Sequence, residues 1–268
     1  MLMRNFGHML CLLLALLVLV AAPISVRTRA QESEQQQAQQ LWEQAIAAKG
    51  GRERLFTVNN MVVSSRGVYA TGVFKKHQVR REEVCVLPDK YWFWDDYRPD
   101  VFGLTVRMYD YGAKRSYMAL NGQPSEPPAL EKNGLGRKAL ITNQADFLLE
   151  TRSLKPTIIK ASSDRIGQHS VAVIQTMIEG ERVDFAFDRK THLPVQISYY
   201  DIFHGKTYVR VHKFSDYIDV GGIKVPSTEE YDDGSKYKVS IQFNVQYNES
   251  IFVKPPPIEA GPEAWKKK

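Results

Sequence analysis

Most of this chain alternates between apolar and polar residues with a period of two, and this alternation restricts what the chain can fold into. The clearest stretch covers residues 237–247, where six apolar residues from Tyr237 to Tyr247 alternate with Lys, Ser, Gln and Asn. Successive side chains of a β-strand point to opposite faces of a sheet, so one face of this strand is apolar and the other faces water. The alternation begins near Val58 and continues through most of the chain. The sequence therefore predicts a mainly β protein.

Turn-forming dipeptides divide the alternating region at intervals. They occur at residues 121–122, 179–180, 204–205, 221–222 and 233–234, and each ends in glycine. Glycine-containing pairs between alternating segments are typical of β-hairpins, in which consecutive strands lie side by side. The spacing of these turns predicts an antiparallel meander.

Two segments break the period of two and show helical spacing instead. The first begins at Leu41 and ends at Gly50-Gly51, because glycine adopts the left-handed conformation that closes a helix. The second covers residues 137–149 and follows a loop rich in Pro and Gly at 124–136. A sheet with one apolar face needs a cover. We therefore expect an α+β fold: a strongly curved antiparallel sheet, or half-open β-barrel, covered by two helices.

The alternation also predicts the register between neighbouring strands. A hairpin loop of three or five residues places apolar residues opposite one another and buries one common face, which strongly favours that register. The expected neighbours are Phe185 with Ile197, Phe187 with Val195, and, on the following strand, Val209 and Val211 beside Tyr199 and Ile197.

One acidic residue does not fit the apolar face of the last two strands. An odd loop around Asp233-Gly234 would place Val225 opposite Phe243, and Glu229 would then share their face. A carboxylate on a buried face is costly unless it is paired. We expect either that Glu229 lies at the rim of the sheet or that the register differs.

The first 30 residues have the three zones of a secretion signal. Arg4 supplies a positive charge, residues 9–22 are apolar and uncharged, and residues 28–30 offer small side chains to a signal peptidase. The apolar run of about 14 residues is shorter than the roughly 20 that a membrane-spanning helix needs. We expect cleavage near Ala30 and a periplasmic location, with a retained N-terminal membrane anchor as the alternative.

The rest of the chain shows no internal linker. We expect a flexible polar leader at 31–40, a single domain at 41–256 and an extended, charged tail at 257–268. Removal of the signal takes away three of the 36 basic residues and no acidic one, which leaves a net charge of +3. This small excess argues against a nucleic-acid partner. Cys85 is then the only cysteine, in an apolar context typical of an inert buried thiol. We expect a monomer.

The sequence contains none of the common catalytic or metal-binding motifs. It has no His-Glu-x-x-His helix, no Gly-x-Ser-x-Gly elbow, no phosphate-binding glycine loop and no Cys-x-x-Cys pair. Acidic doublets occur at 82–83, 95–96, 229–230 and 232–233. Neighbours on a strand point to opposite faces, so we interpret these doublets as solvated turns and strand edges. We expect no enzyme activity, no metal site and no cofactor.

An aromatic cluster at residues 91–94 is richer than one strand needs. Trp92 and Trp94 share one parity, and Tyr91 and Phe93 share the other. One interpretation is core packing on one side and contact with a helix or a sheet edge on the other. The alternative is an aromatic wall of an apolar ligand cavity, with residues 98–104 as a flap.

Four segments resemble a known family. Residues 41–51 are similar to the opening helix, residues 187–195 to a hairpin, residues 214–226 to a strand-turn-strand unit, and residues 248–255 to the closing segment of the bacterial outer-membrane lipoprotein carrier and sorting superfamily. The resemblance covers nearly all of the chain after the signal. It implies a half-open barrel with helices in its mouth and a hydrophobic concave face that holds acyl chains. Residues 98–136 look like an elaboration, and no single functional position can be matched.

These observations favour a non-enzymatic carrier or sensor that binds a lipid or an acylated lipoprotein, with envelope membrane proteins as further expected partners. The alternatives are an envelope protein-interaction or assembly module with a filled core and no ligand cavity, and a hydrolase whose site is assembled from scattered residues. The residues expected to form the ligand-binding apolar face are Trp92, Trp94, Phe147, Leu148, Val183, Phe185, Phe187, Val195, Ile197, Tyr199, Val209, Val211, Val239, Ile241 and Phe243.

Overall fold

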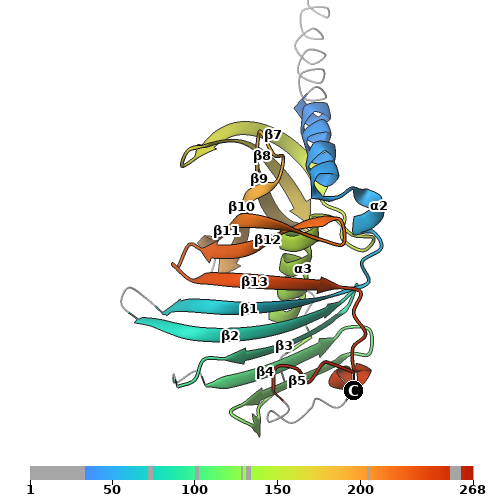
Figure 1. Ribbon diagram of the computed structural model, residues 1–268, viewed down its shortest axis with the longest axis vertical. Helices are drawn as coiled ribbons and strands as arrows, with labels where there is room; N and C mark the ends of the chain where they lie inside the picture. Colours follow the sequence, from blue (N-terminus) through green and yellow to red (C-terminus); the bar gives the residue numbers. More distant parts are fainter. Residues whose placement is uncertain are drawn as a thin grey trace, which may run out of the picture.

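A computed structural model describes residues 34–71, 75–99, 103–127, 129–130, 134–203, 206–253 and 261–267. They form one curved, open antiparallel sheet of thirteen strands with helices packed against it (Figure 1). This confirms the predicted fold class. The strands are β1 (Asn60–Thr71), β2 (Lys75–Val86), β3 (Lys90–Asp96), β4 (Leu104–Asp110), β5 (Arg115–Leu120), β6 (Gln123–Pro124), β7 (Thr157–Ile166), β8 (His169–Ile178), β9 (Glu181–Asp188), β10 (Pro194–Phe203), β11 (Lys206–Val220), β12 (Ile223–Tyr231) and β13 (Lys236–Phe243).

The first strand of the chain, β1, and the last, β13, lie side by side in the middle of the sheet. The strand order is β6-β5-β4-β3-β2-β1-β13-β12-β11-β10-β9-β8-β7, so β1 pairs with β13 and the edges are β6 and β7. Gly67 of β1 lies opposite Tyr237 of β13. A Cβ atom at Gly67 would collide with the Lys236 carbonyl group, so glycine permits the close approach of these two strands.

Three helical segments and one 3-10 turn accompany the sheet. The N-terminal helix covers residues 34–49, so it begins earlier than expected, and residues 34–40 are helical where the sequence predicts a flexible leader. It ends at Gly50 and Gly51, whose φ angles are 131° and 88°. The other segments are α2 (Arg52–Leu55), α3 (Leu135–Leu148) and η1 (Glu249–Phe252). No helix among the described residues is long and apolar enough to span a membrane.

Side chains pack into two separate cores on the two faces of the sheet. The larger core lies on the concave face, where Trp42 of the N-terminal helix and Leu140 of α3 are buried. The smaller core lies on the opposite face, where Trp92 and Trp94 pack under Trp265. The Trp265 indole donates a hydrogen bond to Glu82 Oε1 at 3.0 Å. Residues 261–267 are therefore docked, although the sequence predicts an extended tail; residues 1–33, with the predicted signal, lie outside the described residues.

Of the two residue pairs predicted between β9 and β10, one is confirmed and the other is wrong. Phe185 pairs with Ile197 as expected. Phe187, however, pairs with Pro194 and not with Val195, because a bulge between Pro194 and Gln196 inserts one residue.

The predicted register of β11 is wrong by one residue. Phe203 pairs with Lys206, Ile197 lies opposite His212, and Tyr199 lies opposite Arg210. A shift of one residue moves every side chain of a strand to the other face. Val209 and Val211 consequently leave the concave face, and Arg210 and His212 take their place.

The register between β12 and β13 brings the misfit acid onto the concave face. Glu229 pairs with Tyr237. The predicted register would have placed Glu229 opposite Val239, so the observed register differs by two residues and leaves the same side chains on each face. Glu229 is only 5% exposed, so it does not lie at a solvated rim.

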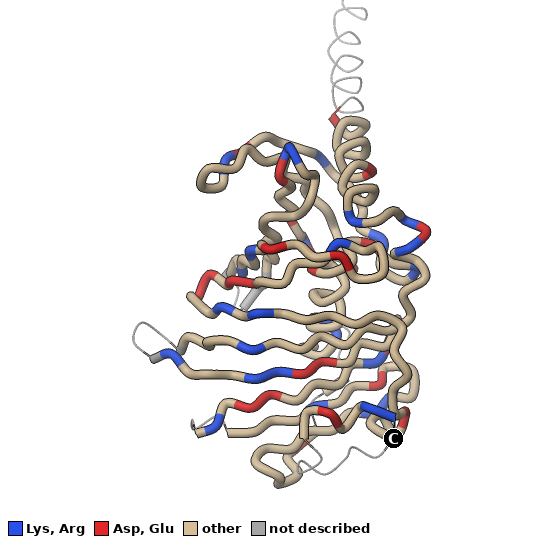
Figure 2. The backbone as a smooth tube through the Cα atoms, in the orientation of Figure 1, with Lys and Arg blue, Asp and Glu red and all other residues tan. Residues whose placement is uncertain are grey.

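Acidic and basic residues are interspersed along the chain (Figure 2). Residues of both signs occur on the strands and on the helices of the described part of the chain.

Candidate functional site

The concave face divides into a filled half and a hollow half. Under the N-terminal helix, the Trp42 ring packs edge-on against Phe185 and Phe187, with ring centroids 5.1 and 5.9 Å apart. By contrast, an open cavity of about 1400 Å³ lies between α3 and the part of the sheet that runs, in spatial order, from β5 through β4, β3, β2, β1, β13 and β12 to β11. This is larger than the roughly 300–1,000 Å³ of ordinary small-molecule sites. The cavity is therefore the candidate site.

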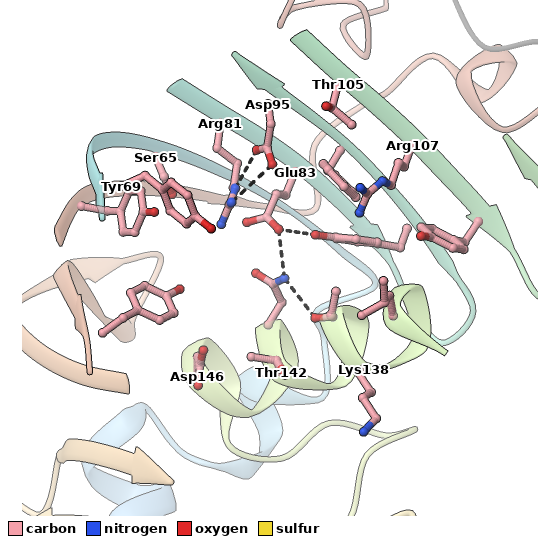
Figure 3. Close-up of a pocket in the computed structure, with 18 of the residues that line it drawn as sticks. Ser65, Tyr69, Arg81, Glu83, Asp95, Thr105, Arg107, Lys138, Thr142 and Asp146 are labelled. Atoms are coloured by element: carbon pink, nitrogen blue, oxygen red, sulfur yellow. Dashed lines mark hydrogen bonds and ion pairs between the residues drawn. The ribbon is translucent and has the colours of Figure 1, made fainter. Parts of the chain in front are cut away.

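Strand parity determines which side chains line the cavity. Odd-numbered residues of β2 and β3, including Arg81, Glu83 and Phe93, point inward. On α3 the lining residues recur at helical spacing, as in Ala139, Asn143 and Asp146, which places them on one face of the helix. Figure 3 shows the strand residues pointing toward this face of α3.

Tyrosines, together with Phe93 and Phe147, form the aromatic part of the cavity wall. Tyr91 lies between Phe93 and Tyr109, with ring centroids 5.5 and 6.2 Å away. Tyr231 and Tyr237 meet edge-on at 5.5 Å on the opposite side. Aromatic side chains supply large apolar surfaces together with hydroxyl groups that form hydrogen bonds. The wall is suited to an amphipathic ligand more than to a purely apolar one.

Arg81 holds one end of the cavity through an ion pair. Its guanidinium donates to both carboxylate oxygens of Asp95, at 2.7 and 3.3 Å, and to the Tyr97 hydroxyl at 3.4 Å. The same guanidinium lies 5.7 Å from the Tyr237 ring centroid. Bidentate pairing of this kind orients an arginine firmly, so the Arg81 charge is already compensated by Asp95.

Glu83 is a buried carboxyl group between the sheet and α3. The Tyr91 hydroxyl and the Asn143 amide both donate to its Oε1 atom. Burial raises the pKa of Glu83, and the positive charge of Arg81 opposes this change. Removal from water favours the neutral form of a carboxyl group.

Asp146 of α3 connects the helix to β10 and β11. The Tyr199 hydroxyl donates to Asp146 Oδ1 at 2.6 Å, and His212 Nδ1 lies 2.9 Å from Asp146 Oδ2. A carboxylate at this distance favours the His212 tautomer whose Nδ1 carries the proton. The other ring nitrogen, Nε2, is then an acceptor, and it has no hydrogen-bond partner among the described residues.

Glu229 is the second acceptor without a full set of partners. Its Oε2 accepts a hydrogen bond from Tyr231 at 3.3 Å, whereas its Oε1 is buried and has no partner in the described part of the chain. Burial raises the pKa of Glu229 well above its usual value, and the charges of Asp146 and Glu83 raise it further.

Lys49 lies behind Asp146, at the end of the N-terminal helix. Its side chain is fully buried, and its Nζ atom has no hydrogen-bond partner within the described ranges. The ammonium lies 5.4 Å from the Tyr217 ring centroid. Burial lowers the pKa of Lys49 to about 7, although Asp146 attracts its charge.

Four of the residues predicted to bind ligand lie away from the concave face. Trp92 and Trp94 belong to the core on the opposite face, which η1 and Trp265 cover. Val209 and Val211 follow the shifted register of β11, and Val209 is 42% exposed. These four assignments are corrected.

Among the other predicted residues, Phe147 lines the cavity. Val183 and Tyr199 line a small recess beside it. Val195 is half-buried at the bulge. The rest pack in the concave-face core, with Phe243 partly exposed; they are Leu148, Phe185, Phe187, Ile197, Val239 and Ile241.

Sequence reasoning missed the polar residues of the cavity. Glu83, Asp95 and Glu229 come from doublets interpreted as solvated, yet they are 7%, 5% and 5% exposed. The sequence contained one signal: Glu229 is an acidic residue on the face of its strand that is otherwise apolar. Asp146 and His212 carried no comparable signal, because only the folded chain brings them together. Among the described residues, no group of three His, Cys, Asp or Glu side chains is placed to hold a metal ion.

Solved structures of other proteins share this architecture. No family model matches the sequence, and no curated protein matches it. A LolA superfamily protein from Nitrosomonas europaea superposes with a TM-score of 0.50 at 11% identity, over 81% of this chain and 97% of that one. A DUF1329 family protein from Desulfovibrio piger gives 0.47 at 11% identity, over 80% and 96%. A domain from Vibrio parahaemolyticus named for outer membrane lipoprotein sorting gives 0.43 at 11% identity, over 80% and 95%. The chain thus shares its fold with the LolA superfamily protein from Nitrosomonas europaea.

Proposed function

We propose that this protein is a non-enzymatic carrier or sensor of the bacterial envelope that binds a lipid, or the acyl chains of a lipoprotein, in the cavity under α3. The observation that carries the proposal is the cavity of about 1400 Å³ with aromatic walls on the concave face. Burial of each methylene group of an acyl chain contributes about 0.8 kcal/mol, so one chain gives useful affinity without a polar motif. The fold shared with a LolA superfamily protein supports the same class of function.

The alternative, an interaction module with a filled core, is supported by only one half of the molecule. Trp42, Phe185 and Phe187 fill the space under the N-terminal helix. The other half remains hollow and opens to solvent between α3 and the sheet. A function that depended on a filled core would not require this hollow, so we favour ligand binding.

A substitution that blocks the cavity tests the proposal. Ala139 is half-buried on the face of α3 that lines the cavity. We expect Ala139→Trp to weaken binding of the neutral fluorophore N-phenyl-1-naphthylamine by about tenfold, since loss of contact with two methylene-sized groups costs roughly 1.6 kcal/mol. Fluorescence titration measures the affinity, and native mass spectrometry of the purified protein should show a bound lipid.

Val209→Trp is the matched control, because it adds the same indole to an exposed position on the other face. It should bind the fluorophore like the wild type. Near-UV circular dichroism verifies that both variants are folded. Equal binding by a folded Ala139→Trp variant, or no binding by the wild type, would exclude the cavity as a lipid site.

A further inference from the structure

Two unpartnered acceptors meet at the β11–β12 end of the cavity. His212 pairs with Tyr231, and Phe214 pairs with Glu229, so His212 and Glu229 are diagonal neighbours on adjacent strands. Diagonal neighbours on one face lie within reach of long side chains. Both residues line the cavity and are at most 5% exposed. His212 Nε2 and Glu229 Oε1 have no hydrogen-bond partner among the described residues.

Buried polar atoms are normally satisfied, and each exception needs an explanation. Both of these atoms are acceptors when His212 carries its proton on Nδ1 and Glu229 is ionised. A ligand group that satisfies them must therefore donate hydrogen bonds. An ammonium group offers three such donors and no acceptor.

The charges around this point select the same ligand group. Asp146 on α3 and Glu83 on β2 act on Glu229 as repulsive charges, and Arg81 is the attractive one. Arg81 is already held by both oxygens of Asp95. The buried groups of the cluster are four carboxyls, namely Glu83, Asp95, Asp146 and Glu229, against the buried Lys49 and His212 and the half-buried Arg81.

Three further cations line the cavity. Lys138 of α3 forms an ion pair with Glu181 at 3.2 Å. Arg107 of β4 lies 5.2 Å from the Phe93 ring centroid, and Arg210 of β11 is exposed and lies 5.7 Å from the Tyr199 ring centroid. The charges that act most strongly on Glu229 are nevertheless two acidic groups, Asp146 and Glu83, and one basic group, Arg81. An anion placed beside Glu229 would meet three carboxyl groups, whereas a cation would neutralise one of them.

We propose that the β11–β12 end of the cavity is a subsite for a primary ammonium group of an amphipathic ligand, held by Glu229 Oε1, His212 Nε2 and the face of the Tyr231 ring. The Tyr231 ring lies 4.3 Å from the His212 ring, centroid to centroid, and it also lines the cavity. Aromatic faces attract cations, most strongly where water is excluded. The apolar part of the ligand then extends along Tyr91 and Phe93. This inference rests on the proposed function and specifies the head group.

Binding of an ammonium group should release a proton. Burial and the charges of Asp146 and Glu83 raise the pKa of Glu229 well above its usual value, which favours the protonated form of this carboxyl group in the empty protein. An ammonium at Oε1 stabilises the carboxylate, and the displaced proton passes to the buffer. We therefore expect a net release of protons on amine binding, with one proton for each amine bound as the upper limit. Calorimetric titrations in two buffers of different ionisation enthalpy measure this number.

The test compares three ligands with equal chains: dodecylamine, dodecanol and dodecanoate, each displacing N-phenyl-1-naphthylamine from the wild type. We expect dodecylamine to bind at least about tenfold more tightly than the other two, the effect of one charge-assisted hydrogen bond. Glu229→Gln keeps the shape of the side chain, should reduce this preference to below about threefold, and should abolish proton release. Glu230→Gln, the half-buried neighbour on the other face of β12, is the matched control and should retain both.

The outcomes separate this inference from the proposed function. If dodecanol binds but dodecylamine shows no preference, or if folded Glu229→Gln keeps the preference, the ammonium subsite is wrong and the lipid cavity stands. If dodecanoate binds most tightly, the subsite is likewise wrong. If none of the three displaces the fluorophore, both proposals fail.

Discussion

Replacing Lys49 with methionine is expected to stabilise the protein, most strongly below pH 7. The folded protein lowers the pKa of Lys49 from 10.5 to about 7 because the ammonium is buried. Below pH 7 the folded protein must keep this charge out of water, which costs at most about 5 kcal/mol, since each unit of pKa corresponds to about 1.36 kcal/mol. Methionine fills a similar volume without charge, so a gain of several kcal/mol is expected.

The pH dependence has a defined sign. Between pH 7 and pH 10.5 the unfolded chain binds a proton at Lys49 that the folded chain does not, so the stability of the wild type rises with pH across this window. The advantage of Lys49→Met should therefore be constant below pH 7 and disappear by about pH 10.5. Urea unfolding at pH 6, 8 and 10 measures it.

Lys213→Met is the control, because Lys213 is exposed on the other face of the sheet. Its free energy of unfolding should change by less than about 0.5 kcal/mol. Lower stability of Lys49→Met at pH 6 would show that attraction between Lys49 and Asp146 outweighs the burial of the ammonium.

Shortening Phe185 to alanine is expected to cost about 3–5 kcal/mol of stability, as is usual for a fully buried phenylalanine. Phe185 is 0% exposed, and its ring packs against Trp42 and stacks with Phe187. The Phe185→Ala variant should nevertheless bind N-phenyl-1-naphthylamine with unchanged affinity wherever it is folded, because Phe185 does not line the cavity. Urea unfolding and fluorescence titration at low urea measure the two effects.

Val209→Ala provides the comparison for this prediction. Val209 is exposed, so its loss should change the free energy of unfolding by no more than about 0.5 kcal/mol. Loss of fluorophore binding by folded Phe185→Ala would mean that the ligand reaches the filled half, and the division of the concave face would be wrong.

The sequence predicts the architecture well because burial of one face constrains strands strongly. Phe185 and Ile197 could be placed on the same face correctly, since a shift of one residue would expose one of them. The N-terminal helix and α3 were also recognisable from their spacing. Each of these inferences depends on the pattern of one or two neighbouring segments.

The cavity could not be predicted in the same way, because its residues come from segments far apart in the chain. On β11, the odd-numbered and the even-numbered residues both include apolar and polar side chains. Val209 and Val211 therefore suggested that the odd-numbered residues face the core, which is wrong. The His-Gly pair at 204–205 permits a two-residue loop, which is the commonest hairpin connection. That loop length, together with Phe214, would have predicted that His212 points inward. The alternation separated Trp92 from Phe93 correctly, but only the docked Trp265 shows which face each one occupies.

The open ends of the sheet have a consequence for behaviour at high concentration. An unpaired edge strand can recruit the same strand of another molecule and begin aggregation. Edge strand β6 is only two residues long and ends in Pro124, which has no amide hydrogen to donate. Edge strand β7 carries a bulge between Ile158 and Lys160, and Asp164 and Arg165 are exposed near its end. A half-barrel built in this way stays open to a ligand on its concave side while both of its borders resist joining another copy.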